Sequence, residues 1–271
     1  MPSQKATVGD IEIAYKQLGE SGAKPIILIT GLGGTMDTWS PLLLEQLTSS
    51  NYSVTIFDNR GAGESTAGTK EFSVSQFAND TAGLLEALKI DKADILSFSM
   101  GSFIAQELTL INPEKVDNLI LYASGCNDRE AEPPSHEVIQ TFSNSSMSPQ
   151  KLGPKIISLL FPADWFKANP DYLNYFPVPK ESVSPEIMGK QTAIENWIGT
   201  GTCNAISNIT QPTLIIVGTD DVFTPTPNSV TLVGRIPGSW LVQIRNAGHG
   251  LMYQYPDRFN NVIMTFLQNN S

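Results

Sequence analysis

Residues 95–102 read Ile95-Leu96-Ser97-Phe98-Ser99-Met100-Gly101-Ser102, and they join a short apolar run to a segment with helical periodicity. A serine at such a junction stands on a sharp, strained turn that exposes its hydroxyl above the edge of a sheet. Small residues two positions before and after the serine keep it clear of neighbouring backbone. Ser97 and Gly101 occupy those positions. Serine is also a common helix N-cap, so the prediction that Ser99 is a nucleophile needs support from the rest of the chain.

Short apolar runs alternate with longer amphipathic segments on both sides of this turn. The runs expected to form strands are residues 25–29, 54–57, 93–98, 119–123, 213–217 and 240–244. Residues 5–8 and 11–18 are expected to form a small antiparallel pair that turns at Gly9-Asp10. This alternation is typical of a mostly parallel sheet covered on both faces by helices, so the sequence predicts the α/β class.

Two covering helices can be placed from the pattern. Ser73 and Gln76 have the spacing of a capping box, which predicts a helix between Phe72 and Ile90. A second helix is expected after Met100, and Asn112-Pro113 should end it.

The alternation stops after Ser124 and resumes at Pro212. Between them lie helical patches with many Pro and Ser and no convincing strand. We therefore expect residues 125–211 to form a helical cap inserted into a core made of residues 1–124 and 212–271. Some aromatic side chains of the cap are candidates for the lining of a substrate pocket. These aromatic residues are Phe161, Trp165, Phe166, Tyr172, Tyr175, Phe176 and Trp197.

Composition excludes several classes of protein. The chain of 271 residues has 41% hydrophobic and 16% charged residues, which suits a folded globular protein. It carries 17 Lys and Arg against 27 Asp and Glu without a basic cluster, so nucleic acids and anionic membranes are not expected partners. No apolar run approaches a membrane span and residues 1–10 do not look like a signal peptide, so a cytoplasmic location is expected. Cys126 and Cys203 give neither a disulfide framework nor metal-ligand spacing, and we expect two small buried thiols and no metal site.

Two glycine-rich motifs follow strands in the first half of the chain. The first is Thr30-Gly31-Leu32-Gly33-Gly34, whose glycines let the backbone bend so that amide groups can point at an anion. The second is Asp58-Asn59-Arg60-Gly61-Ala62-Gly63-Glu64-Ser65. We expect Asp58 and Arg60 to pin this second loop through polar contacts and to take no direct part in chemistry.

Two motifs near the C-terminus supply a carboxylate and an imidazole. They are Gly218-Thr219-Asp220-Asp221-Val222-Phe223-Thr224-Pro225 and Asn246-Ala247-Gly248-His249-Gly250. A histidine between glycines at the end of a strand is poorly placed for core packing, because glycines provide access rather than bulk. His249 is therefore expected to be functional. The other histidine, His136, follows Pro133-Pro134-Ser135 and is expected at an exposed helix start.

With these motifs in this order, the sequence resembles the α/β-hydrolase superfamily. It is similar to the branch with small caps that contains esterases, enol-lactonases, cofactor-free haloperoxidases and carbon–carbon bond hydrolases. The resemblance covers nearly the whole chain outside the cap and implies the α/β-hydrolase fold. It makes Ser99 the nucleophile, Asp221 the acid and His249 the base. Ser97 departs from the GxSxG pattern of the family at its first glycine.

The resemblance also assigns the supporting groups. In the family the acid stands three residues after the strand-ending glycine and four before a proline, which favours Asp221 over the alternative Asp220. Asp128 is a minor candidate, because some relatives supply the acid just after the preceding core strand. The backbone N–H groups of Leu32 and Met100 would form the oxyanion hole. Many relatives carry histidine at the position of Thr30, which is a second departure.

The expected reaction is cleavage of carboxylic esters of small substrates. A serine needs a base within reach, and the imidazole of His249 would allow Ser99 to form an acyl-enzyme that water then releases. Relatives that dehalogenate alkanes or open epoxides use an aspartate nucleophile, so Ser99 argues against those reactions. Enol-lactonase, perhydrolase and carbon–carbon hydrolase activities would use the same triad and remain alternatives.

A hydrolase-like receptor, in which the triad is kept but the pocket senses a small molecule, is an alternative from another class. A dinucleotide site does not fit, because Gly31, Gly33 and Gly34 do not form GxGxxG. No cofactor is therefore expected. The expected partner is a small ester or related acyl substrate, and the expected assembly is a monomer or a homodimer.

Overall fold

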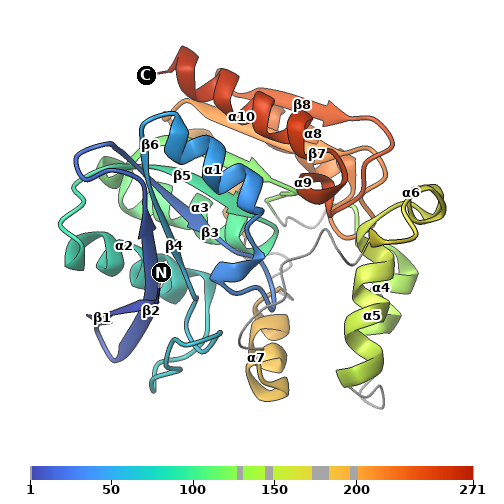
Figure 1. Ribbon diagram of the computed structural model, residues 1–271, viewed down its shortest axis with the longest axis horizontal. Helices are drawn as coiled ribbons and strands as arrows, with labels where there is room; N and C mark the ends of the chain where they lie inside the picture. Colours follow the sequence, from blue (N-terminus) through green and yellow to red (C-terminus); the bar gives the residue numbers. More distant parts are fainter. Residues whose placement is uncertain (1, 127–130, 144–148, 173–182, 196–200, 271) are drawn as a thin grey trace.

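The computed structural model describes residues 2–126, 131–143, 149–172, 183–195 and 201–270 (Figure 1). Its centre is an eight-stranded sheet with the order β1-β2-β4-β3-β5-β6-β7-β8. The strands are β1 (Gln4–Val8), β2 (Ile11–Leu18), β3 (Lys24–Ile29), β4 (Tyr52–Phe57), β5 (Ala93–Phe98), β6 (Val116–Tyr122), β7 (Thr213–Gly218) and β8 (Trp240–Ile244). All six strands from β3 onwards run parallel, which confirms the predicted α/β class and the six predicted runs.

The predicted N-terminal antiparallel pair is confirmed, and it also joins the central sheet. β2 pairs with β1 and also with β4, where Tyr15 lies opposite Phe57 and Leu18 opposite Val54. The pair therefore extends the central sheet at the β4 edge. The burial of Ile13, Ala14 and Tyr15 explains this, because both faces of β2 are covered at these positions.

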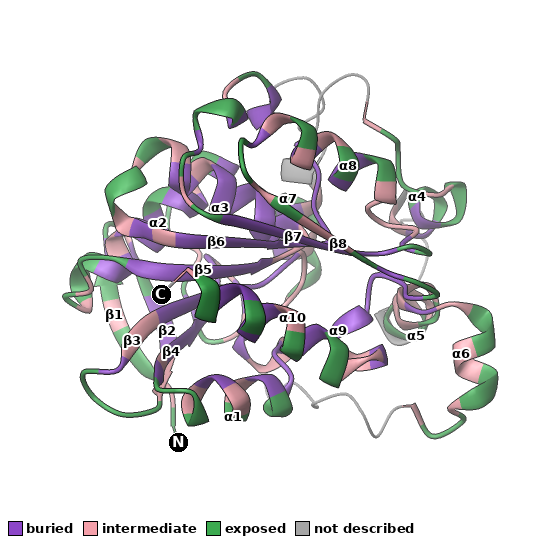
Figure 2. Ribbon diagram, turned by 90° about the horizontal axis from the view of Figure 1, so that it is seen from above, coloured by how far each residue is buried: buried purple, intermediate pink, exposed green. Residues whose placement is uncertain are grey.

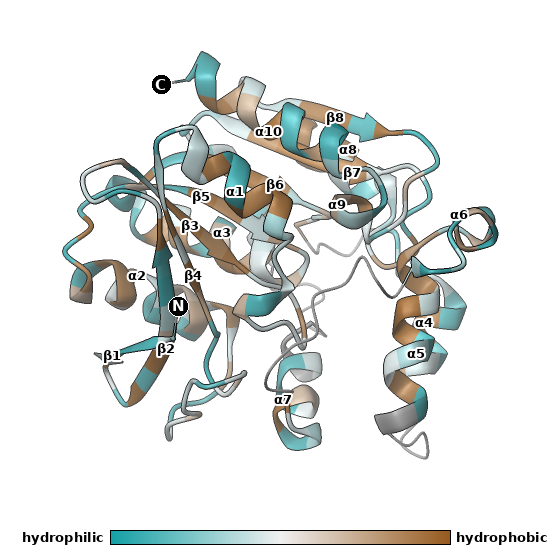
Figure 3. Ribbon diagram, in the orientation of Figure 1, coloured by the Kyte–Doolittle hydropathy of each residue, from teal (hydrophilic) through white to brown (hydrophobic). Residues whose placement is uncertain are grey.

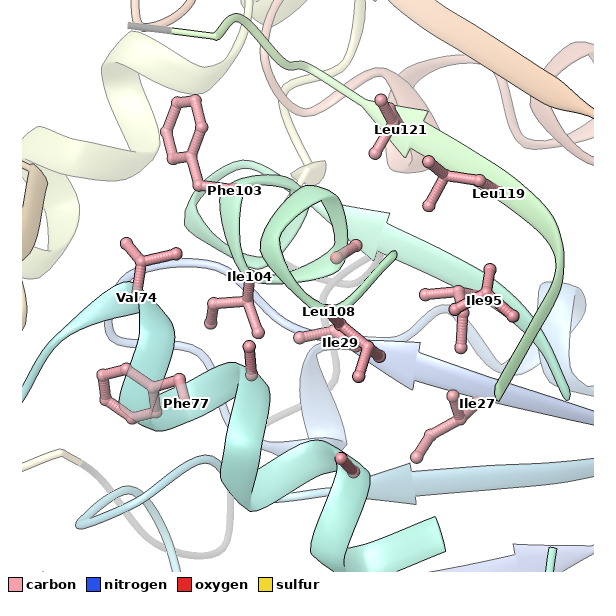
Figure 4. Close-up of a cluster of buried hydrophobic side chains, with 14 of the residues drawn as sticks. Ile27, Ile29, Val74, Phe77, Ile95, Phe103, Ile104, Leu108, Leu119 and Leu121 are labelled. Atoms are coloured by element: carbon pink, nitrogen blue, oxygen red, sulfur yellow. The ribbon is translucent and has the colours of Figure 1, made fainter. Parts of the chain in front are cut away.

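Helices cover both faces of the sheet, and Figure 2 shows the buried strands between helices that carry both buried and exposed residues. One apolar core joins the sheet to α2 (Val74–Ala87), α3 (Met100–Ile111) and α8 (Thr226–Arg235). Figure 4 shows Leu108 of α3 beside Ile29 of β3, and Ile104 of α3 facing α2. A second core on the opposite face includes α1 (Pro41–Ser49) and α10 (Pro256–Asn269). A fully buried leucine such as Leu108 contributes about 1.5–3 kcal/mol to folding through removal of its surface from water.

The segment between β6 and β7 is helical in its described part. It contains α4 (His136–Ser143), α5 (Pro149–Leu160), α6 (Ala163–Ala168) and α7 (Pro185–Glu195), and no strand is found among its described residues. Figure 3 shows apolar and polar residues side by side on α4 and α5, as expected for helices that bury one face. α4–α7 extend from the side of the sheet on which the parallel strands end (Figure 1). We call this segment the insertion.

The prediction that the two cysteines are free thiols is wrong. Cys126 and Cys203 form a disulfide with a Cα–Cα distance of 4.9 Å, and both residues are buried as expected. Cys126 follows β6, and Cys203 lies in the segment that leads into β7. Because β6 and β7 are neighbours in the sheet, the fold brings together two residues that are 77 positions apart. Spacing along the chain gave no sign of this, since only the sheet order makes the two positions adjacent.

Candidate active site

Ser99 lies between β5 and α3 in a backbone conformation that serines rarely adopt. Its φ is 54° and its ψ is −123°, so the turn is strained and lifts the side chain out of the sheet. A Cβ at Gly101 would collide with the carbonyl oxygens of Ile29 and Thr30. The tight packing of α3 on the end of β3 therefore requires a glycine at this position.

Ser97 occupies the first glycine position of the family pattern without disturbing the turn. Its side chain is fully buried, and its Oγ donates to the carbonyl oxygen of Ile120 on β6 at 2.8 Å. The hydroxyl is thus small enough for the site, and a strand carbonyl satisfies its hydrogen bond. This contact explains how the sequence tolerates the departure from GxSxG.

His249 connects the hydroxyl of Ser99 to the carboxylate of Asp221. Its Nε2 lies 3.0 Å from Ser99 Oγ, and its Nδ1 lies 2.8 Å from Asp221 Oδ2 and 3.0 Å from Oδ1. Histidine and aspartate are both buried, with relative exposures of 4% and 5%. The structure therefore brings the three predicted side chains together over the carboxyl ends of β5, β7 and β8. In this arrangement the carboxylate can hold the Nδ1 proton, which leaves the Nε2 lone pair directed at the hydroxyl.

The geometry distinguishes Asp221 from the neighbouring Asp220. Asp221 Oδ1 accepts backbone N–H groups from Phe223 and Thr224, both at 2.9 Å, which fix the direction of the carboxylate. Asp220 is exposed, and its side chain accepts a hydrogen bond from Thr219. Asp128 lies outside the described residues.

Aromatic rings surround the imidazole and hold its loop. Phe98 and Phe223 contact the ring of His249 with centroid distances of 4.9 and 4.7 Å. Tyr122 is fully buried beneath them, and its hydroxyl donates to the carbonyl oxygen of His249. Burial raises the pKa of Tyr122 well above its ordinary value, so this donor keeps its proton at neutral pH. Sequence reasoning missed all three residues, because an aromatic residue in or near a strand is indistinguishable from an ordinary core residue.

The glycine turn of residues 30–34, here called the oxyanion turn, lies directly against Ser99. A Cβ on Gly31 would stand 2.9 Å from Ser99 Cβ, so only glycine permits this approach. Thr30 replaces the histidine of many relatives, and its Oγ1 accepts a hydrogen bond from Asn59 Nδ2 at 3.3 Å. The same amide donates to the Thr30 carbonyl at 3.2 Å, so the second glycine loop supports the first.

The backbone N–H groups of Leu32 and Met100 are available as donors. Within the described part of the chain, neither N–H group has a protein acceptor. Met100 begins α3, where the first N–H groups of a helix are unpaired and carry partial positive charge. Met100 follows Ser99 in the chain, and the oxyanion turn that contains Leu32 packs against Ser99. Both N–H groups are therefore suited to donate to a negative oxygen that forms beside the Ser99 hydroxyl.

Asp58 and Arg60 make the polar contacts expected of them. Asp58 accepts the backbone N–H of Met36 at 2.7 Å and that of Glu64 at 2.9 Å, and its burial raises its pKa. Arg60 is fully buried and pairs with Asp10 and Asp80 at 2.9 and 2.8 Å. These contacts fix the loop of residues 58–65, which in turn supports Thr30.

The other sequence candidates belong to the insertion. His136 is exposed at the start of α4, as expected. Phe161 is buried and stacks on Trp165 at 4.3 Å, and Phe166 contacts both Phe161 and Tyr172. The candidate aromatic residues Tyr175, Phe176 and Trp197 lie outside the described residues.

The insertion contacts the histidine loop directly. The N–H of Gly250 donates to the carbonyl oxygen of Leu160 at 2.8 Å. A Cβ on Gly250 would meet the ring of Phe161, and one on Gly248 would meet the backbone of Leu160. The two glycines that flank His249 therefore make room for the end of α5, which is a more specific reason than access to solvent.

Two features are absent from the described residues. These residues contain no group of three or more His, Cys, Asp or Glu residues arranged to hold a metal ion. Among the helices they form, none has the length and apolar character needed to span a membrane.

The fold and this arrangement of residues define the class of the protein, and comparison with known proteins agrees. The profile of the family described as alpha/beta hydrolase fold matches residues 24–256, so the chain belongs to this family, which confirms the resemblance. A relative that carries the name non-heme bromoperoxidase BpoC, from Mycobacterium tuberculosis, is 28% identical over 94% of this chain and 97% of its own length. A relative that carries the name carbamate hydrolase RutD, from Caulobacter sp., is 26% identical over 91% of each chain. The crystal structure of an enol-lactonase from Burkholderia xenovorans superposes with a TM-score of 0.83 at 23% identity, covering 98% of this chain and 100% of the other.

Proposed function

We propose that this protein hydrolyses carboxylic esters of small substrates with Ser99 as nucleophile, His249 as general base and Asp221 as the group that orients the imidazole. The observation that carries the proposal is the position of His249, whose two ring nitrogens lie within 3.0 Å of the hydroxyl and the carboxylate. The positive φ of Ser99 supports it, because a residue that serves only as a helix cap has no need of a strained conformation.

The proposed reaction proceeds in two halves. Ser99 Oγ attacks the carbonyl carbon while His249 Nε2 takes its proton, and the N–H groups of Leu32 and Met100 stabilise the negative oxygen. The carbon–oxygen bond then breaks, and the imidazolium returns the proton to the departing alcohol. In the second half His249 deprotonates a water molecule that attacks the acyl carbon, which releases the acid and restores the Ser99 hydroxyl.

The experiment is hydrolysis of p-nitrophenyl acetate and butyrate by the wild-type chain and by Ser99→Ala. We expect multiple turnovers from the wild-type chain and a loss of more than about a thousandfold in kcat in the variant. Mass spectrometry should find a fluorophosphonate attached to Ser99. Equal turnover by the two proteins would refute the role of Ser99. A stoichiometric release of p-nitrophenol without further turnover would refute the hydrolase and favour a ligand-sensing protein.

A panel of substrates separates ester hydrolysis from the reactions of relatives. An enol-lactone, a vinylogous 1,5-diketone and acetate with hydrogen peroxide test for lactonase, carbon–carbon hydrolase and perhydrolase activity. Our proposal requires the highest kcat/KM with a simple ester, and a higher value for one of the other three would replace it by that reaction.

A further inference from the structure

Helix α7 of the insertion lies on the oxyanion turn. The Met188 side chain packs against Gly33, where an added Cβ would collide with it, and the Ile187 side chain packs against Gly61 of the second glycine loop. Gln191 stands one helical turn after these residues and is fully buried. Its Oε1 accepts the backbone N–H of Gly33 at 2.9 Å, across a separation of 158 residues. One face of α7 is thus fitted to the part of the site that would hold the oxyanion.

In the oxyanion turn, the N–H groups of Gly33 and Gly34 have protein acceptors, whereas the N–H of Leu32 is left for a substrate. The N–H of Gly34 donates to the Gly31 carbonyl oxygen at 3.1 Å, and Gln191 takes the N–H of Gly33. The N–H of Leu32, the candidate oxyanion donor, has no acceptor in the described part of the chain. Gly33 has a φ of 67° and no side chain, so its backbone is free to rotate unless something holds it.

Gln191 is also an unfavourable choice for packing alone. Its Nε2 is buried and has no hydrogen-bond partner among the described residues. An unsatisfied buried donor costs about 1–3 kcal/mol, and an apolar side chain of the same length would avoid that cost. An apolar side chain, however, could not accept the hydrogen bond from the N–H of Gly33.

We infer that Gln191 is a positioning residue for the oxyanion turn. Its side-chain carbonyl fixes the peptide group between Leu32 and Gly33, so that the adjacent N–H of Leu32 is held toward the hydroxyl of Ser99. The packing of α7 on the core then also completes the oxyanion hole. This inference rests on the proposed function, because an oxyanion donor matters only if an acyl group reacts at Ser99.

The test compares Gln191→Met with Lys190→Met. Methionine keeps the length of the glutamine and removes the acceptor, whereas Lys190 is a half-exposed neighbour on the same helix that pairs with Glu186. Loss of an oxyanion donor typically costs a hundredfold to a thousandfold in kcat, and a misplaced donor costs less, so we expect about a tenfold to hundredfold fall in Gln191→Met. KM for p-nitrophenyl butyrate should stay within about threefold of the wild-type value, because the oxyanion forms only after binding. Lys190→Met should retain both values.

Amide hydrogen exchange at Gly33, followed by NMR, tests the contact independently of turnover. Exchange should be faster in Gln191→Met and unchanged in Lys190→Met. Unchanged exchange at Gly33 in Gln191→Met would overturn the inference. Faster exchange with an unchanged kcat, or a loss carried entirely by KM, would overturn it as well.

The inference and the proposed function can fail separately. A wild-type chain that hydrolyses no ester refutes the proposed function. The rate at which a fluorophosphonate modifies Ser99 then decides the inference, because that reaction also builds negative charge on an oxygen beside the nucleophile. Slower modification in Gln191→Met than in Lys190→Met would support the positioning role, and equal rates or no modification would overturn it.

Discussion

Replacement of Asp221 by asparagine is expected to reverse the proton arrangement of His249. Asp221 Oδ1 accepts two backbone N–H groups, so the amide oxygen of an asparagine must take that position. Its NH₂ group then occupies the position of Oδ2, which lies 2.8 Å from His249 Nδ1. Because this donor lies nearer to Nδ1 than the amide oxygen at 3.0 Å, it favours an unprotonated Nδ1, and the ring proton moves to Nε2, where it faces Ser99 and blocks proton transfer.

The magnitude follows from the loss of the base. The equivalent tautomer change in a serine protease lowers kcat by about ten-thousandfold, which corresponds to about 5.5 kcal/mol in the activation free energy. We expect a loss of about a thousandfold to ten-thousandfold here, with little change in KM, because the shape of the site is preserved. The thermal unfolding midpoint should change little, since the asparagine oxygen keeps both backbone hydrogen bonds.

The assay is steady-state hydrolysis of p-nitrophenyl butyrate at pH 8, with Asp220→Asn as the matched control. Asp220 is exposed, and we expect less than a twofold change on its replacement. A loss of less than tenfold in Asp221→Asn would refute the reasoning. A larger loss in Asp220→Asn or Asp128→Asn would assign the acid to that residue instead.

Three further predictions concern the supporting structure. Gly101→Ala should lower kcat by more than about tenfold and the free energy of unfolding by about 1–3 kcal/mol. The added methyl group meets the carbonyl oxygens of Ile29 and Thr30 and must shift the Ser99 turn. Steady-state kinetics measures the first effect, and urea unfolding measures the second. Replacement of both Cys126 and Cys203 by serine should lower the free energy of unfolding by about 4 kcal/mol, because the disulfide closes a loop of 77 residues, and urea unfolding measures the loss. Asp10→Asn should lower the unfolding midpoint at pH 7, and the difference from wild type should shrink below about pH 4, since hydrogen bonds from Arg60 hold the pKa of Asp10 below its ordinary value.

Each of these predictions has its own contradicting result. Wild-type activity in Gly101→Ala would show that the turn has room for a side chain. Equal unfolding of the wild-type chain with and without a reductant would show that the disulfide does not stabilise the fold. The sign for Asp10 is fixed, because a carboxylate with a lowered pKa stabilises the fold above its unfolded pKa and loses this contribution on acidification. A difference that grows toward acid pH would contradict the pairing with Arg60.

The strands and the Ser99 turn could be predicted because their signals are local. Parallel strands buried on both faces are continuous apolar runs, and the turn requires a small residue two positions either side of Ser99. Ser97 and Gly101 meet that requirement by different means, one through a hydrogen bond to β6 and the other through the absence of a Cβ.

The contacts that hold the site together could not be predicted, because they join residues far apart in the chain. Tyr122 supports His249 across 127 residues, and Gln191 reaches Gly33 across 158. Neither residue stands out in sequence, since a tyrosine at the end of a strand and a glutamine in a helix are both ordinary. Their roles depend on which loops the sheet order and the insertion bring into contact.

The Cys126–Cys203 bond has a consequence for protein engineering. It makes the intervening stretch a covalent ring whose two ends are tied 4.9 Å apart at the Cα atoms, so a single backbone cut within the ring leaves both fragments attached. A foreign sequence added within this ring would therefore stay anchored at both ends by one short cross-link between the loops that follow β6 and precede β7.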